Sequence, residues 1–484
     1  MVEKPNILFI LTDDQGAWAM RCAGNADVIT PNLDRLAADG TRFDHFFCAS
    51  PVCSPARASI LTGTIPSAHG VQDWLRGGNV DPHTPGAERH PELAHDHAAI
   101  RYLDNLTCYT DLLAESGYTC ALSGKWHLGA SLEPQHGFSH WFTIARGGCN
   151  YDKPDLVRDG KLSFETRYVT DLITEDALST LDTLSQAAAP FYLSVHYTAP
   201  HSPWDREEHP ADVWDLYEGC EYKATPELPY HPWQVETAPH GTGERRRELL
   251  RGYYTAITAM DRGVGRLLDR LDALGLVDNT LVIFTGDNGM NLGQHGVWGK
   301  GNGTFPMNMY DTSVMVPCII RGPKVARAAV CDVMLSHLDI LPTLREYLSL
   351  AGEVRQPLPG RSFAPILSGG TLPDTPVVVF DEYGPVRMLR TRTHKLVVRY
   401  PYGPDELYDL ICDPDETQNR IEDPAYAALR VTMRAELESW FVRYADPPID
   451  GARSGVTGSG QLCRPGIYAK GKPVFAPIPP RIAN

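Results

Sequence analysis

The sequence predicts an α/β protein with a large, mainly parallel sheet flanked by helices and a smaller C-terminal α+β subdomain that contains an antiparallel sheet. Two observations lead to this prediction. Over the first three quarters of the 484 residues, short β-rich stretches alternate with helical patterns, which is typical of parallel strands joined by crossover helices. After Ser368-Gly369-Gly370 this alternation stops, and closely spaced β-rich stretches favour antiparallel pairing.

Four short apolar stretches are expected to form strands of the main sheet, at residues 6–11, 119–123, 191–197 and 280–285. Helices are expected where apolar residues recur at helical spacing and a glycine follows, at residues 31–39, 110–115, about 245–274 and 336–350. Thr30 is expected to cap the first of these helices, with Pro31 at its first position.

The C-terminal part is expected to fold separately from the main sheet. Residues 377–380, 387–392 and 395–399 are predicted strands, and residues 424–444 a helix that Asp423 caps. The change in pattern near residue 370 divides the chain into a main α/β domain (1–370), an antiparallel-sheet subdomain with one helix (371–446) and an extended tail rich in Pro and Gly (447–484).

Composition excludes several classes of partner. The formal net charge of −16 makes the chain a poor general binder of nucleic acids and of anionic membranes, so neither is expected as a partner. No apolar run reaches the roughly 18 residues of a membrane span, and the N-terminal apolar stretch is too short for a signal peptide. We therefore expect a cytoplasmic protein. The 11 cysteines indicate neither a disulfide framework nor a CxxC zinc site, and the oligomeric state is left open.

A polar cluster follows each of the four predicted strands. The clusters are Thr12-Asp13-Asp14-Gln15-Gly16, Gly124-Lys125-Trp126-His127, Thr198-Ala199-Pro200-His201 and Gly286-Asp287-Asn288-Gly289. Because open α/β sheets bind ligands beyond the carboxyl ends of their strands, these clusters should converge.

Asp13, Asp14, Asp287 and Asn288 offer oxygen ligands, and three carboxylates at one place would repel each other without a cation. Oxygen-only ligation favours Ca²⁺ or Mg²⁺ over zinc. Both segments are also good turn formers and could be simple turns. Their position at two strand ends favours the metal site.

The stretch Cys53-Ser54-Pro55-Ala56-Arg57 with Leu61-Thr62-Gly63 resembles the signature of type I, formylglycine-dependent sulfatases in the alkaline-phosphatase-like superfamily. The polar clusters above, Trp298-Gly299-Lys300, Ser336-His337-Leu338-Asp339 and Leu407-Tyr408-Asp409-Leu410 resemble further segments of that family, in order, over about residues 5–445. The sequence departs from many members at Ala56, where they have serine, and at Thr64, where they have arginine, which bears on the efficiency of maturation.

The resemblance implies the alkaline-phosphatase-like fold and a sulfatase that hydrolyses a sulfate monoester of a carbohydrate or an aryl alcohol. It implies that a separate maturation enzyme oxidises Cys53 to formylglycine, whose hydrate attacks sulfur and whose second hydroxyl allows sulfate to leave. One Ca²⁺ per chain, with Mg²⁺ as the alternative, is expected on Asp13, Asp14, Asp287 and Asn288, with residue 53 completing its shell.

Roles for the other site residues follow from the same resemblance. Arg57 is expected to contact the diol and the metal ligands, while Lys125 and Lys300 hold sulfate oxygens. His127 is the candidate base for the second hydroxyl, and His201 is the candidate acid for the leaving oxygen.

Trp74, Arg76 and His295 are the candidates for contacts with the alcohol part of the substrate. Two alternatives to the sulfatase remain. One is a phosphonate or phosphate ester hydrolase of the same superfamily, and the other is a catalytically silent binding protein on this fold.

Overall fold

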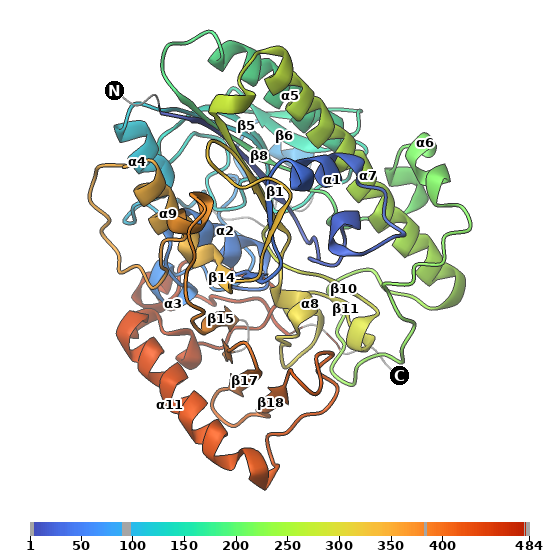
Figure 1. The fold of residues 1–484 in the computed structure, drawn as a ribbon, viewed down its shortest axis with the longest axis vertical. Helices are drawn as coiled ribbons and strands as arrows, with labels where there is room; N and C mark the ends of the chain where they lie inside the picture. The colour runs from blue at the N-terminus through green and yellow to red at the C-terminus, as the bar shows by residue number, and fades with distance from the viewer. Residues whose placement is uncertain (1–3, 90–97, 382–384, 479, 481–484) are drawn as a thin grey trace.

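The computed structural model describes residues 4–89, 98–381, 385–478 and 480. Its centre is a ten-stranded sheet in the order β13-β2-β12-β9-β1-β8-β4-β5-β6-β7 (Figure 1). The strands are β1 (Asn6–Thr12), β2 (Thr41–Phe43), β4 (Thr119–Gly124), β5 (Phe138–Ile144), β6 (Asp155–Arg158), β7 (Lys161–Phe164), β8 (Phe191–His196), β9 (Thr280–Gly286), β12 (Cys318–Arg321) and β13 (Ala329–Cys331).

The middle of this sheet is parallel, as predicted. β9, β1, β8, β4 and β5 are consecutive and parallel, and they include all four of the predicted strands. Towards the edges, β12 pairs antiparallel with β9, β6 with β5 and β7 with β6, so the sheet is mixed. Every residue of β1 is buried, because helices cover both faces of a sheet of this kind.

Helices pack on both faces of the sheet (Figure 1). Ile7 and Phe9 share one core with α2, α4 and α9, whereas Leu8 and Ile10 share another with α1, α5 and α7, as the alternation of side chains along a strand requires. The helices are α1 (Pro31–Ala38), α2 (Cys53–Thr62), α3 (Pro66–His69), α4 (Tyr109–Glu115), α5 (Val169–Leu184), α6 (Ala211–Trp214), α7 (Gly243–Ala273), α8 (Asp311–Val314), α9 (Ile340–Tyr347), α10 (Ala364–Leu367) and α11 (Ala427–Tyr444).

Two details of the predicted helices differ in the structure. Thr30 is the N-cap residue of α1, as predicted, but its hydroxyl accepts a hydrogen bond from Arg21 N, and Asp261 of α7 accepts from the Asn32 and Leu33 amides instead. The helix predicted at 336–350 is shorter, because Ser336 belongs to a two-stranded pair and caps a single 3₁₀ turn before α9 begins.

The C-terminal sheet is separate from the main one, with four antiparallel strands in the order β15-β16-β17-β18 (Figure 1). One face, including Val379 and Val397, joins the main core, and the other, including Leu389 and Val398, packs on α11. The fourth strand was not predicted. The strands here and in the two small sheets are β15 (Val377–Asp381), β16 (Val386–Arg390), β17 (His394–Arg399), β18 (Glu406–Asp409), β3 (Phe46–Phe47), β14 (Leu335–Ser336), β10 (Asn291–Leu292) and β11 (Trp298–Gly299).

The tail that follows α11 is not a free extended arm. Its described residues, 447–478 and 480, contain three short 3₁₀ turns, at Pro447–Ile449, Gly451–Arg453 and Gly466–Ala469. Its residue Gln461 forms a parallel bridge with Leu75 of the main domain. The expectation of an extended tail is therefore corrected, because the segment folds back onto the loop that follows α3.

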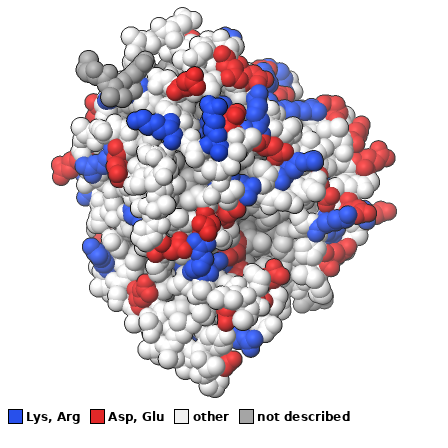
Figure 2. All heavy atoms as spheres, viewed as in Figure 1, with Lys and Arg blue, Asp and Glu red and all other residues white. Residues whose placement is uncertain are grey.

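The surface carries charges of both signs. Over the face drawn in Figure 2, Lys and Arg side chains alternate with Asp and Glu without a broad field of either sign. Within the part of the chain that the structure describes, no helix combines the length and the apolar character needed to cross a membrane.

Candidate active site

The polar clusters that follow four strands converge at one edge of the sheet. β9, β1, β8 and β4 are neighbours and run parallel, so their carboxyl ends meet. One carboxylate oxygen from each of Asp13, Asp14 and Asp287 lies within 4.8 Å of the other two. The convergence predicted from the sequence is confirmed by this geometry.

These oxygens fit a divalent cation. Asp14 has a left-handed φ of 62°, which turns the chain so that two adjacent carboxylates reach the same place. Asn288 Nδ2 donates to Asp14 Oδ1 at 2.9 Å, which brings the amide into the cluster. Among the described residues, the buried oxygens Asp13 Oδ1 and Asn288 Oδ1 have no hydrogen-bond partner. Unsatisfied buried oxygens beside three carboxylates are the donor set that Ca²⁺ or Mg²⁺ requires.

Three buried cations pair with the three carboxylates. Arg57 Nε donates to Asp287 Oδ2 at 2.9 Å, Lys125 pairs with Asp13, and Lys300 pairs with Asp14. When all six side chains are ionised, their charges cancel. A bound divalent cation would then leave the cluster positive, which favours an anionic ligand.

The carboxyl groups respond differently to this environment. Burial alone would raise the pKa of Asp13, but Lys125, His201 and the other cations hold it well below its usual range. Burial and the charge of Asp13 raise the pKa of Asp287 to about 7. A cation in the cluster would favour the ionised form of Asp287, because it removes the repulsion between the carboxylates.

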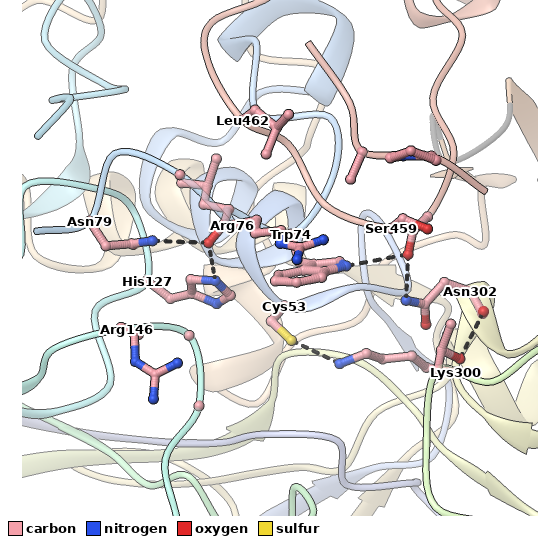
Figure 3. Close-up of a pocket in the computed structure, with 18 of the residues that line it drawn as sticks. Cys53, Trp74, Arg76, Asn79, His127, Arg146, Lys300, Asn302, Ser459 and Leu462 are labelled. Carbon is pink, nitrogen blue, oxygen red and sulfur yellow. Dashed lines mark hydrogen bonds between the residues drawn. The ribbon is translucent and has the colours of Figure 1, made fainter. Parts of the chain in front are cut away.

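Cys53 begins α2, as the sequence predicted, and it lies in the cavity beside Lys300 (Figure 3). Lys300 Nζ donates to Cys53 Sγ at 2.8 Å. Burial, followed by the charge of Asp13, raises the pKa of the Cys53 thiol to about 12. At neutral pH the unmodified side chain is therefore a thiol rather than a nucleophilic thiolate.

His127 is a buried, neutral imidazole. Burial, followed by the charges of Lys125 and Arg57, lowers its pKa well below the usual value. His127 Nε2 lies 3.1 Å from the carbonyl oxygen of Leu75, so this nitrogen carries the proton. Nδ1 then holds a lone pair, and among the described residues it has no partner. The ring can therefore accept a proton.

His201 lies nearer to solvent, at the mouth of the same cavity. Its Nδ1 is 2.7 Å from the carbonyl oxygen of Ser202, and its Nε2 is 3.7 Å from Asp14 Oδ2. The side chain is 27% exposed, compared with 6% for Asp14. His201 can thus reach both the carboxylate cluster and a ligand that enters from outside.

The cavity has a volume of about 1010 Å³ and is lined by six of the predicted site residues. Cys53, His127 and Lys300 line it, as do the two predicted substrate contacts Trp74 and Arg76 (Figure 3). His201 also lines it. Arg57 and Lys125 lie beneath this surface. Arg57 forms an ion pair with Asp287, and Lys125 forms one with Asp13.

The third predicted substrate contact, His295, lies away from the cavity, so this prediction is corrected. It stacks on Tyr310 with ring centroids 3.8 Å apart, and it is not one of the described residues that line the cavity. Its own neighbourhood includes the charged side chains of Lys395 and Asp311. The Gly-rich loop that carries it turns its ring towards the C-terminal sheet instead.

Several cavity residues were missed by sequence reasoning. Arg146, Asn79, Asn302 and Glu236 are dispersed single residues in loops, and no local pattern distinguishes them. The tail residues Ser459 and Leu462 also line the cavity, although the tail resembled nothing recognisable. Only the fold brings these positions together.

Comparison with known proteins agrees with this geometry. The family model described as Sulfatase matches residues 5–350, and that of the N-sulphoglucosamine sulphohydrolase C-terminal region matches residues 293–442. An N-acetylglucosamine-6-O-sulfatase from Bacteroides thetaiotaomicron is 29% identical over 92% of this chain and 87% of its own length. A choline-sulfatase from Rhizobium meliloti is 29% identical over 89% of this chain and 85% of its own.

A solved structure agrees over nearly the whole fold. It is a complex with the substrate D-glucosamine-2-N,6-O-disulfate, with a TM-score of 0.76 and 26% identity, covering 93% of this chain and 99% of the other. The signature around Cys53 and the main sheet lie within the match to the Sulfatase model, and the C-terminal antiparallel sheet lies within the match to the second model. The chain belongs to the sulfatase family, the sulfuric ester hydrolases of the alkaline-phosphatase-like superfamily.

Proposed function

We propose that this sulfatase hydrolyses the sulfate monoester of a small carbohydrate to the free alcohol and inorganic sulfate. The observation that carries the proposal is Cys53, which opens a buried helix and contacts Lys300 beside three convergent carboxylates. The comparisons support the carbohydrate, since they include an N-acetylglucosamine-6-O-sulfatase and a solved complex with D-glucosamine-2-N,6-O-disulfate. An aryl sulfate is the second candidate.

Conversion of Cys53 to formylglycine by a maturation enzyme is part of the proposal. Formylglycine is general in the sulfatase family, and the high pKa of the Cys53 thiol argues against direct attack by sulfur. The hydrated aldehyde supplies two hydroxyls, one that attacks and one whose deprotonation allows sulfate to leave. Lys300, at hydrogen-bond distance from position 53, would favour the anionic form of the attacking oxygen.

The divalent cation general to the family would be held by Asp13, Asp14, Asp287 and Asn288, with residue 53 beside them. We assign it as Ca²⁺, with Mg²⁺ as the alternative, because every protein ligand is an oxygen. When bound, the cation supplies positive charge for the nucleophile and for the sulfate oxygens. Arg57 keeps Asp287 oriented through its bond to Oδ2.

Two histidines divide the proton transfers. His127 Nδ1 holds a lone pair and accepts the proton of the second hydroxyl. His201 donates a proton to the leaving oxygen, since it lies at the mouth of the cavity where the alcohol departs. Lys300, which lines the cavity, neutralises the oxygens of the sulfate, and Lys125 adds positive charge from beneath, through Asp13.

A substrate panel tests the function directly. The matured protein is expected to hydrolyse sulfated monosaccharides and 4-nitrophenyl sulfate, with at least about tenfold lower kcat/KM for matched phosphate and phosphonate esters. Release of sulfate, phosphate and alcohol would be measured under the same conditions. A higher kcat/KM for a phosphonate ester would replace the proposal with the alternative hydrolase, and no turnover of any ester would favour a silent binding protein.

Maturation of Cys53 should decide activity. Protein made without the maturation enzyme is expected to fold but to lose at least about 10³-fold in turnover, because a thiol has no second hydroxyl. Mass spectrometry of the peptide around residue 53 would report the conversion. Cys412→Ser, at an exposed thiol remote from the cavity, serves as the control and should keep full activity. Repeated turnover by fully unconverted protein would contradict the mechanism.

The cation should be lost when a ligand is neutralised. Wild-type protein is expected to contain one Ca²⁺ per chain, and Asp287→Asn less than about a tenth of that, because a neutral amide cannot replace the carboxylate charge. Added Ca²⁺ at 100 times Kd should stabilise wild type by about 2.7 kcal/mol, and the variant much less. Elemental analysis and thermal unfolding would measure both. Asp339→Asn is the control and should retain the cation, because Asp339 is buried outside the site, in the capping box of the 3₁₀ turn at His337–Asp339. Finding only stoichiometric zinc would contradict the assignment.

If His201 is the acid, the loss of kcat on its removal should depend on the leaving group. His201→Ala should lower kcat for a sugar sulfate by about 10²- to 10⁴-fold, because an alkoxide needs a proton. The loss for 4-nitrophenyl sulfate should be less than about tenfold, because nitrophenolate leaves without one. His295→Ala is the matched control and should change neither rate. Equal losses for both esters would rule out His201 as the acid.

A further inference from the structure

The tail beyond α11 closes one side of the cavity that contains Cys53. Gly458, Ser459, Leu462 and Ile478 all line it. Figure 3 shows Ser459 and Leu462 across the pocket from Arg146, with Trp74 between them and Cys53. The two family models end at residues 350 and 442, so this wall comes from a segment outside both matches.

Gln461 fixes the tail to the loop after α3. Its Oε1 accepts hydrogen bonds from the amides of Gln72 and Asp73, at 2.8 and 3.2 Å, and its Nε2 donates to Gly70 O at 2.9 Å. Its backbone pairs with the same loop. Gln461 N donates to Trp74 O, and Gln461 O accepts from the amides of Arg76 and Gly77. Gln461 is fully buried, so breaking these bonds would leave polar groups unsatisfied.

Asp73 holds the tail from the opposite direction. Its Oδ2 accepts from the amides of Gly458 and Gly460, each at 3.1 Å. The carbonyl oxygen of Gly458 in turn accepts from Trp74 Nε1 at 3.3 Å and from Asn302 Nδ2 at 3.2 Å. Gly460 has a φ of 111°, and a Cβ there would lie 3.0 Å from the Trp74 ring. The tail and the indole therefore have fixed relative positions.

The two sides of the cavity differ in chemistry. The side around Cys53 holds buried charges that suit the sulfate. On the other side, the indole of Trp74 and the aliphatic side chains of Leu462 and Ile478 offer apolar surface. Ile478 is 50% exposed without a ligand, which is surface that a bound ring would cover.

We infer that the tail is the wall of the leaving-alcohol subsite, and that it selects alcohols with one flat apolar face. This inference rests on the proposed function and gives it a substrate class. An aryl ring and the C–H face of a pyranose both present such a face to Trp74 and the aliphatic wall. Gln461 and Asp73 are positioning residues. Gln461 binds the backbone of the loop after α3, Asp73 binds the backbone of the tail, and neither is among the described residues that line the cavity.

Binding to unconverted Cys53 protein tests the inference without turnover. The probes are glucosamine 6-sulfate, 4-nitrophenyl sulfate and inorganic sulfate, measured by titration calorimetry. The Leu462→Ala/Ile478→Ala variant should weaken binding of the better ester by about five- to twentyfold, because apolar contact is lost. Its Kd for inorganic sulfate should change by less than about twofold, since sulfate has no alcohol part.

Ile467→Ala is the matched control, because Ile467 is in the same tail, is 76% exposed and is not among the described residues lining the cavity. It should leave all three Kd values unchanged. Gln461→Ala should weaken ester binding in the same direction as the double variant, without changing the Kd for sulfate. This second variant tests the docking of the tail separately from its contact with ligand.

The outcomes distinguish the alternatives. If the double variant loses affinity only for 4-nitrophenyl sulfate, the subsite takes an aryl alcohol. If it loses affinity only for glucosamine 6-sulfate, the subsite takes a pyranose. Unchanged binding of both esters in the double variant, or an equal loss for inorganic sulfate, would overturn the inference. The proposed function is tested independently, by turnover of the matured wild-type protein.

Discussion

The mutual neutralisation of three carboxylates and three cations, all buried at one edge of the sheet, determines how the rest of the site is built. An unpaired charge at any of these positions would cost several kcal/mol, so each partner must come from a fixed backbone. Arg57 reaches Asp287 only because α2 is buried over its whole length. The same burial places Cys53, four residues before Arg57, against Lys300 and the carboxylates.

The parallel centre of the sheet makes this cluster possible. Carboxyl ends of neighbouring parallel strands lie at one edge, so residues that are far apart in the chain meet there. Side chains in a strand alternate between faces, and the left-handed conformations of Asp14 and His127 break that alternation where β1 and β4 end. These turns direct successive side chains towards the buried charge cluster and the cavity above it rather than into the two helical layers.

Local sequence was sufficient for the features that depend on contiguous residues. The apolar runs predicted the four central strands, and the oxygen-bearing turns predicted where carboxylates gather. Features that depend on distant residues could not be predicted. Asp261 caps α1 across 229 positions, and Gln461 binds Gln72 across 389, with no local signal at either. His295 was misplaced for a related reason, since its neighbour Tyr310 decides its orientation.

The cavity has separate regions for the sulfate and for the alcohol part of the ester, and the two interactions differ in strength. Sulfate is common to every ester of this kind and carries the charge, so the groups that hold it must be buried and mutually fixed. An alcohol is recognised through neutral contacts, each worth about 1 kcal/mol per buried methylene. In the proposed alcohol subsite, Leu462 and Ile478 would make contacts of that size, and both belong to a tail outside the charge cluster. A change in this wall can therefore alter the alcohol that fits while the neutralised cluster around Cys53 stays intact.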